Sequence, residues 1–201
     1  MGLWWNQSIN ESMRLVRGGI QSQRHYERSR KMAAETKQIF DQLTQQTVTF
    51  QVIHPVETVN VLGETLTAPH EYWVPQGQAV TDEAAWLEPK DDVDRNLQAD
   101  YALFRRTFHF LTPAEIKANR LALHLTLRET AAALGMSFST LSDIENGRLL
   151  QSMDQEVKLR YLAERPAFGH FVAQHATIIG NRLTRQGVNA PRFFEKLAAH
   201  V

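Results

Sequence analysis

Residues 126–147, TLRETAAALGMSFSTLSDIENG, contain the start and stop signals of two short helices in immediate succession. The segment Thr126-Leu127-Arg128-Glu129 has the threonine and glutamate of a capping box, which predicts the start of the first helix. Gly135 stands where a helix ends in a left-handed conformation, Ser137 is a cap for the next helix, and Gly147 follows its end. The stretch therefore predicts two short helices joined by a tight turn that contains a glycine.

Two short helices joined in this way form a helix-turn-helix, in which the second helix can lie in the major groove of DNA. The hydrophobic residues fall where the packing of such a pair requires them, at Ala131, Leu134, Met136, Leu141 and Ile144. Capping, turn chemistry and hydrophobic pattern thus agree on one arrangement, and this agreement is the main evidence for it.

The same stretch resembles the Xre/Cro-repressor-like helix-turn-helix family, whose recognition helix often ends in Ser-x-Ile-Glu-Asn-Gly, as Ser142 to Gly147 do here. The resemblance implies a five-helix DNA-binding domain over residues 111–165 and operator DNA as the partner. By position, the residues expected to face base edges are Phe138, Ser139, Thr140 and Asp143. Those expected near phosphates are Thr126, Ser137, Asn146 and Arg148.

This chain departs from many relatives of that family, which have glutamine at the position of Leu127 and basic or amide residues at that of Phe138. Within 111–160, six basic residues are offset by six acidic ones, so we expect modest affinity per domain. A homodimer on a two-part operator would compensate. The alternative is a protein-interaction antitoxin or adaptor that uses the helix-turn-helix fold without binding DNA, and it predicts no salt-dependent duplex binding.

Residues 47–110 are expected to form a small antiparallel β unit and a linker helix. Strand-like segments occur at 47–53, 57–62, 65–68, 72–74 and 79–80, and a helical spacing of hydrophobic residues follows over 96–108. In front of the helix-turn-helix, Thr112-Pro113-Ala114-Glu115 provides another capping box with proline in the first helical position.

The order of motifs from 47 to 165 also resembles the MqsA/YgiT-type antitoxins, which join a zinc-binding β domain to an Xre-type domain. The motifs are Val61-Leu62-Gly63-Glu64, the turn of 72–80, Asp100-Tyr101, the segment 111–116, and Gln151-Ser152 with Leu159. In that family a Cys-x-x-Cys-Gly knuckle would occupy 73–77, where this chain has Trp73 and Gln76 instead of ligands. His54 and His70 do not complete a zinc site, so we expect no metal. The resemblance implies a toxin protein as partner and repression of the chain's own operon, whereas a prophage-type repressor is the alternative.

The two ends of the chain are expected to be helical. Residues 1–46 form the N-terminal arm, with a weakly amphipathic helix over 21–43. Residues 166–201 form a C-terminal tail, with one helix over 168–183 and another that starts at Pro191. Their hydrophobic faces either pack within the chain or supply a two-fold dimer interface. The fold class is therefore mainly α with a small antiparallel β unit (α+β).

The composition narrows the function classes. The 201 residues include no cysteine, which excludes disulfides and thiolate chemistry, and 22 basic residues balance 22 acidic ones. No hydrophobic run approaches the roughly 20 residues of a membrane span, and the N-terminus does not resemble a signal peptide, so a cytoplasmic location is expected. Five of the eight histidines lie on expected helical segments without a partner acid at a meaningful spacing, so the sequence predicts neither an enzyme nor a cofactor; they are His109, His124, His170, His175 and His200.

Overall fold

The structure is a computed structural model, and it describes residues 35–42 and 45–201. The chain divides into two units, residues 1–52 and 53–201, and each is described by itself. In the first unit, β1 (Thr36–Asp41) pairs antiparallel with β2 (Gln46–Ile53), with Thr36 opposite Gln51 and Asp41 opposite Gln46.

The helix expected over 21–43 is wrong for residues 36–41, which form β1. Side chains of β1 alternate between exposed and half-buried, the period of a strand, and they pair with the β-branched segment Thr47–Thr49. Pairing with that neighbour outweighs a weak helical pattern. The remainder of the expected N-terminal arm, residues 1–34, lies outside the described residues.

The β unit continues with a hairpin of β3 (Val56–Val61) and β4 (Glu64–Pro69), antiparallel over their whole length. Its two-residue turn is Leu62-Gly63, both at positive φ, as tight hairpins require. The strand β5 (Tyr72–Pro75) follows, and Trp73 forms a bridge with Leu87. The four strands predicted within residues 47–74 are confirmed, but residues 79–80, where a fifth was predicted, form no strand.

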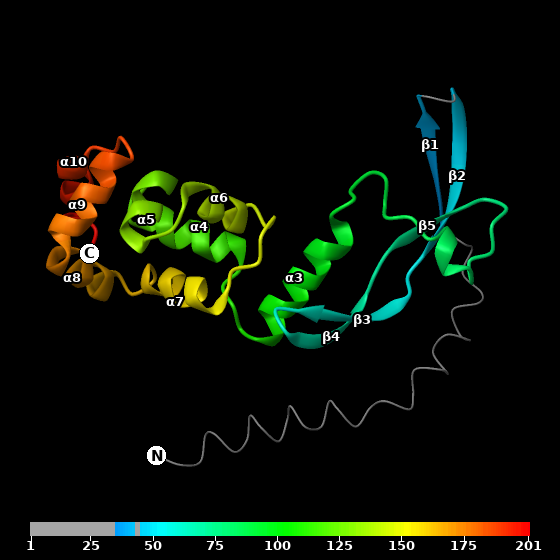
Figure 1. The fold of residues 1–201 in the computed structure, drawn as a ribbon, viewed down its shortest axis with the longest axis horizontal. Coiled ribbons are helices and arrows are strands. Elements are labelled where there is room, and N and C mark those ends of the chain that lie inside the picture. Colours follow the sequence, from blue (N-terminus) through cyan, green and yellow to red (C-terminus); the bar gives the residue numbers. More distant parts are fainter. Residues whose placement is uncertain (1–34, 43–44) are drawn as a thin grey trace, which may run out of the picture. The chain divides into compact units, whose positions relative to one another are not determined.

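The linker helix α3 (Arg95–Thr107) packs against the β3–β4 hairpin, as Figure 1 shows. A small hydrophobic cluster joins them and includes one residue from beyond the helix-turn-helix: Val61, Leu66, Phe104 and Leu150. A short 3₁₀ helix (Glu83–Ala85), capped by Asp82, precedes α3.

Seven further helices make up the rest of the chain (Figure 1). They are α4 (Pro113–Ala122), α5 (Leu127–Leu134), α6 (Phe138–Glu145), α7 (Met153–Tyr161), α8 (Arg165–Gln174), α9 (Ala176–Arg185) and α10 (Ala190–Ala198). The described part of the chain is thus mainly α with small antiparallel sheets, which confirms the predicted fold class. In that part, no helix is long and apolar enough to cross a membrane.

The C-terminal tail shares one hydrophobic core with the helix-turn-helix. Helix α9 packs on α5, and α10 packs on α9. The buried residues that the tail supplies are Phe168, Val172, Ile179, Leu183, Phe193 and Leu197. Its main hydrophobic face is therefore used within the chain. The single helix expected over 168–183 is wrong, because the chain bends at His175 and divides it into α8 and α9.

Candidate nucleic-acid interface

The helix-turn-helix forms as its capping residues predict. The Thr126 hydroxyl accepts a hydrogen bond from the Glu129 amide (3.2 Å), and the Glu129 carboxylate accepts one from the Thr126 amide (2.7 Å). Gly135 ends α5 at φ 72°, the left-handed region that favours glycine. The Ser137 hydroxyl caps α6 by accepting from the Thr140 amide (3.0 Å). Each of these capping predictions is confirmed.

The helix pair is held from behind by a continuous core. All five core residues predicted for the pair are buried: Ala131, Leu134, Met136, Leu141 and Ile144. Since Leu141 and Ile144 face the core, the opposite side of α6 is turned away from it.

A buried ion pair fixes the end of α6 to α4. The guanidinium of Arg120 donates to both carboxylate oxygens of Glu145, at 2.7 and 2.8 Å, and to the Leu125 carbonyl at 2.8 Å. Both side chains are more than nine-tenths buried, so the bidentate geometry restricts rotation of α6 against α4. The sequence analysis missed this pair, because 25 residues separate its members and no local spacing signals it.

The exposed beginning of α6 carries hydroxyl groups in close contact. The Ser137 hydroxyl lies 3.0 Å from that of Ser139 and 2.7 Å from that of Thr140. Ser137, Phe138 and Ser139 are exposed, and Thr140 is partly exposed. These four predicted site residues thus lie together on one surface, with hydroxyls that can donate or accept and one aromatic ring.

An arginine that the sequence analysis did not assign lies at this surface. The guanidinium of Arg128, in the first turn of α5, lies over the Phe138 ring, 4.8 Å from its centroid. This cation–π contact brings a positive charge to the start of α6 and restricts the ring. Its signal in the sequence was a basic residue two positions after the capping Thr126.

Two residues to which the family resemblance gives different roles form an ion pair. Arg148 donates to one oxygen of Asp143 from Nε (3.0 Å) and from Nη2 (2.7 Å), and both side chains are substantially exposed. Asp143 is thereby neutralised at the far end of α6. Asn146 uses its amide on the Ser142 carbonyl (2.8 Å), so it caps the helix end.

The start of α5 is also tied to the C-terminal helix. Lys196 of α10 donates to both oxygens of Glu129, at 2.8 and 3.1 Å. Burial alone would raise the pKa of Glu129, but hydrogen bonds from Lys196 and Thr126 outweigh burial and lower it. The C-terminal helix thus stabilises the same capping box that positions Thr126.

The β unit has a buried polar network and no metal cluster in the described residues. The His70 ring contacts Glu57 (2.7 Å) and Asp100 (2.9 Å), and Tyr72 donates to the same Glu57 oxygen (2.8 Å). Burial lowers the pKa of His70, but the hydrogen bonds to Asp100 and Glu57 outweigh it and raise the pKa. Trp73, which stands where the zinc knuckle of the antitoxin family would be, is buried and donates to Glu71 (2.8 Å). An indole thus fills this place.

Comparison with protein families matches residues 116–154, from α4 to the start of α7, to the helix-turn-helix family in its Xre/Cro type. This segment is a helix-turn-helix domain of the type found in Xre-family DNA-binding regulators. The match does not extend over the β unit, where the resemblance to MqsA/YgiT-type antitoxins rests on sequence motifs alone. No curated protein and no solved structure matches this chain.

Proposed function

We propose that the chain is a sequence-specific repressor that binds an operator near its own gene, with α6 in the major groove. The observation that carries the proposal is the orientation of α6. Leu141 and Ile144 are buried in the core, while Phe138 and Ser139 are exposed at its start. A helix that presents its N-terminal residues from a rigid core is what base-edge contacts in a groove require.

The proposed contacts divide by chemistry. Phe138, Ser139, Thr140 and Asp143 contact base edges, and the Phe138 ring packs on thymine methyl groups. Thr126, Ser137, Asn146 and Arg148 lie near phosphates, and Arg128 joins this second group. Because acidic and basic residues balance in 111–160, two copies on a two-part operator supply the affinity that one domain lacks.

The motif order shared with MqsA/YgiT-type antitoxins supports a narrower version of the proposal. In it, the protein is the autorepressing antitoxin of a toxin–antitoxin operon, and the β unit binds the toxin. The position of Trp73 and the polar network around His70 support a β unit that is ordered without metal.

The test is a fluorescence-polarisation titration with duplex DNA from directly upstream of the gene, at two salt concentrations and against a scrambled duplex. Thr140→Ala is expected to change the preference among operator variants. Thr184→Ala, an exposed threonine on α9, is the matched control and should bind as the wild type does. Absence of binding at low salt would contradict the proposal and favour a domain that contacts only proteins.

A further inference from the structure

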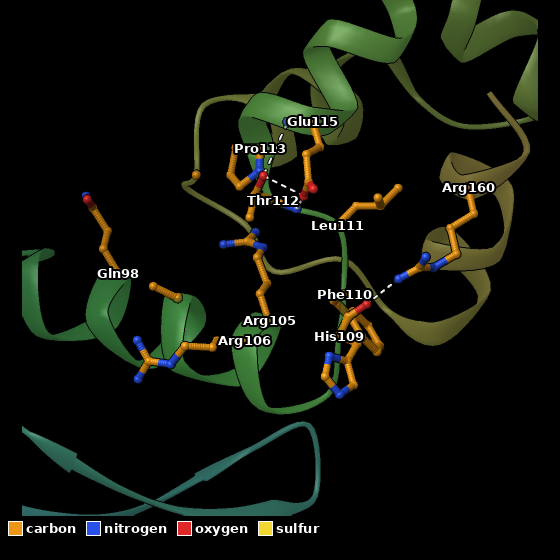
Figure 2. Close-up of a pocket in the computed structure, with 12 residues that line it drawn as sticks. Gln98, Arg105, Arg106, His109, Phe110, Leu111, Thr112, Pro113, Glu115 and Arg160 are labelled. Atoms are coloured by element: carbon orange, nitrogen blue, oxygen red, sulfur yellow. Dashed lines mark hydrogen bonds between the residues drawn. The ribbon is translucent and has the colours of Figure 1, made fainter. Parts of the chain in front are cut away.

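An open cavity of about 790 Å³ lies between α3 and the start of α4, beside the loop that follows α6. Its walls come from three places: Gln98, Ala102, Arg105 and Arg106 of α3, the segment from His109 to Pro113 with Glu115, and Gly147 with Arg160. Figure 2 shows these side chains around the space, with the arginines reaching from α3 and from α7. The volume is in the range of small-molecule sites.

The lining of this cavity is strongly positive. It includes Arg105, Arg106 and Arg160 but only one acidic residue, Glu115. The Glu115 carboxylate is engaged at the start of α4, where it accepts hydrogen bonds from the amide and the hydroxyl of Thr112 (2.8 and 2.7 Å). The lining itself therefore has two more positive than negative charges, and the ion pair of Arg160 with Glu156, outside the lining, reduces this excess to one.

Arg105 is the buried one of these three cations. Its side chain is 4% exposed, and it donates to two neutral acceptors, Gln151 Oε1 (3.1 Å) and the Leu149 carbonyl (2.9 Å). These bonds use two of the five N–H donors of a guanidinium. Burial lowers the pKa of Arg105, as expected for a cation taken out of water. A buried cation with neutral partners is costly unless an anion joins it.

Glu156, the carboxylate that acts electrostatically on Arg105, already has partners of its own. Glu156 accepts from the Leu111 amide and from Gln151 (both 3.0 Å), and it pairs with Arg160 Nε (2.7 Å). Arg160 also donates to the His109 carbonyl. His109 itself has φ 57°, a left-handed conformation that is uncommon for a residue other than glycine. Strained backbone of this kind gathers at ligand sites.

We propose that this cavity binds a phosphate group, with Arg105, Arg106 and Arg160 as its ligands. Guanidinium groups bind phosphate oxygens in pairs of parallel hydrogen bonds. A phosphate monoester carries about −1.5 to −2 charges near neutral pH, and the guanidinium groups of the lining would offset this charge. The phosphate comes either from a small phosphorylated molecule or from the DNA backbone, since Gly147 in the cavity wall precedes Arg148 of the interface.

Isothermal titration calorimetry with inorganic pyrophosphate, at constant ionic strength and without DNA, tests the first source. The wild type should show saturable binding at one site. Arg106→Ala removes an exposed charge, and Ala102→Phe fills the cavity without changing charge. Each should weaken binding by about ten-fold or more. Arg165→Ala, an exposed arginine on α8 outside the lining, should bind as the wild type does.

Polarisation titrations with duplex DNA test the second source. If the DNA backbone supplies the phosphate, pyrophosphate gives no saturable heat, but Arg106→Ala weakens binding to every duplex and reduces the salt slope by about 1. The proposal is overturned if all variants bind pyrophosphate equally. It is also overturned if pyrophosphate does not bind and Arg106→Ala leaves the salt slope unchanged. DNA binding by the wild type is measured separately, so the repressor function is supported or contradicted independently of the phosphate site.

Discussion

The guanidinium of Arg128 lies over the ring of Phe138, 4.8 Å from its centroid. The contact links the first turn of α5 to the first residue of α6, across the turn that contains Gly135. It holds an exposed aromatic ring in one orientation at the place where α6 would enter a groove. A ring that is already restricted loses less conformational entropy on binding.

Replacement of Phe138 by alanine should remove a preference for thymine. If the ring packs on a thymine methyl group, the wild type should bind the operator more tightly than a duplex with uracil at the contacted positions. Phe138→Ala should bind both duplexes alike. The binding free energy lost by the variant on the thymine duplex is expected to be about 1 kcal/mol per methyl contact. Polarisation titrations with the two duplexes measure this. An equal preference for thymine in wild type and variant would rule out the contact.

Removal of Asp143 should release Arg148 from its ion pair. Their contacts of 2.7 and 3.0 Å restrict the guanidinium and offset its charge, so Asp143→Ala should strengthen binding to all duplexes and raise the salt slope by about 1. Arg148→Ala should weaken binding to all duplexes and lower that slope. Titrations over a series of salt concentrations measure both.

The base-edge contact proposed for Asp143 predicts a second effect of the same variant. If it accepts from a cytosine amino group, as proposed above, Asp143→Ala should also lose discrimination at one base pair, in addition to the general gain in affinity. Thr140→Ala is the reference for a change in preference among operator variants. Because threonine carries no charge, this variant should leave the salt slope unchanged.

The stability of the β unit should fall as the pH rises past the pKa of His70. That pKa is raised in the folded protein, so the protonated ring favours the folded state. Its contribution is complete below the unfolded value of about 6.5 and is lost as the pH rises through the folded value.

Urea unfolding of the wild type and His70→Gln over a range of pH measures this effect. The difference in unfolding free energy between them should be larger near pH 6 than near pH 8.5, because the protonated ring stabilises the folded state. Asp100→Asn removes a negative charge that raises the pKa of His70, so it should make the pH dependence smaller. A difference that is constant with pH would show that His70 contributes only through packing and neutral hydrogen bonds.

The structure was predicted best from the sequence where the residues that determine it are close together in the chain. The caps at Thr126 and Ser137, the end at Gly135 and the core of the helix pair follow from spacings of three or four residues, which the backbone geometry fixes. The strand β1 could not be recognised alone, because its partner β2 decides its conformation. Contacts over long separations, such as Arg120 with Glu145, leave no periodic trace in the sequence.

The same limit applies to the candidate site. Sequence position brought Phe138, Ser139 and Thr140 together correctly, since they are consecutive on one helix. It did not show that Arg148 is paired with Asp143, because Arg148 lies beyond the end of α6, where helical spacing no longer applies. Sequence patterns also did not indicate the cavity beside α3, since its arginines lie on two different helices and more than 50 residues separate Arg106 from Arg160.

Two glycines predict opposite effects of the same substitution. Gly135 has φ 72°, and a Cβ there would lie 3.3 Å from the Arg182 guanidinium, so Gly135→Ala should destabilise the protein by about 1–2 kcal/mol. Gly180 lies within α9, and its Cβ would meet Phe194 at an ordinary 3.6 Å. Gly180→Ala should stabilise by about 0.5–1 kcal/mol, because alanine loses less backbone entropy in a helix. Urea unfolding monitored by circular dichroism measures both, and a loss of stability in Gly180→Ala would contradict the packing of α10 on α9.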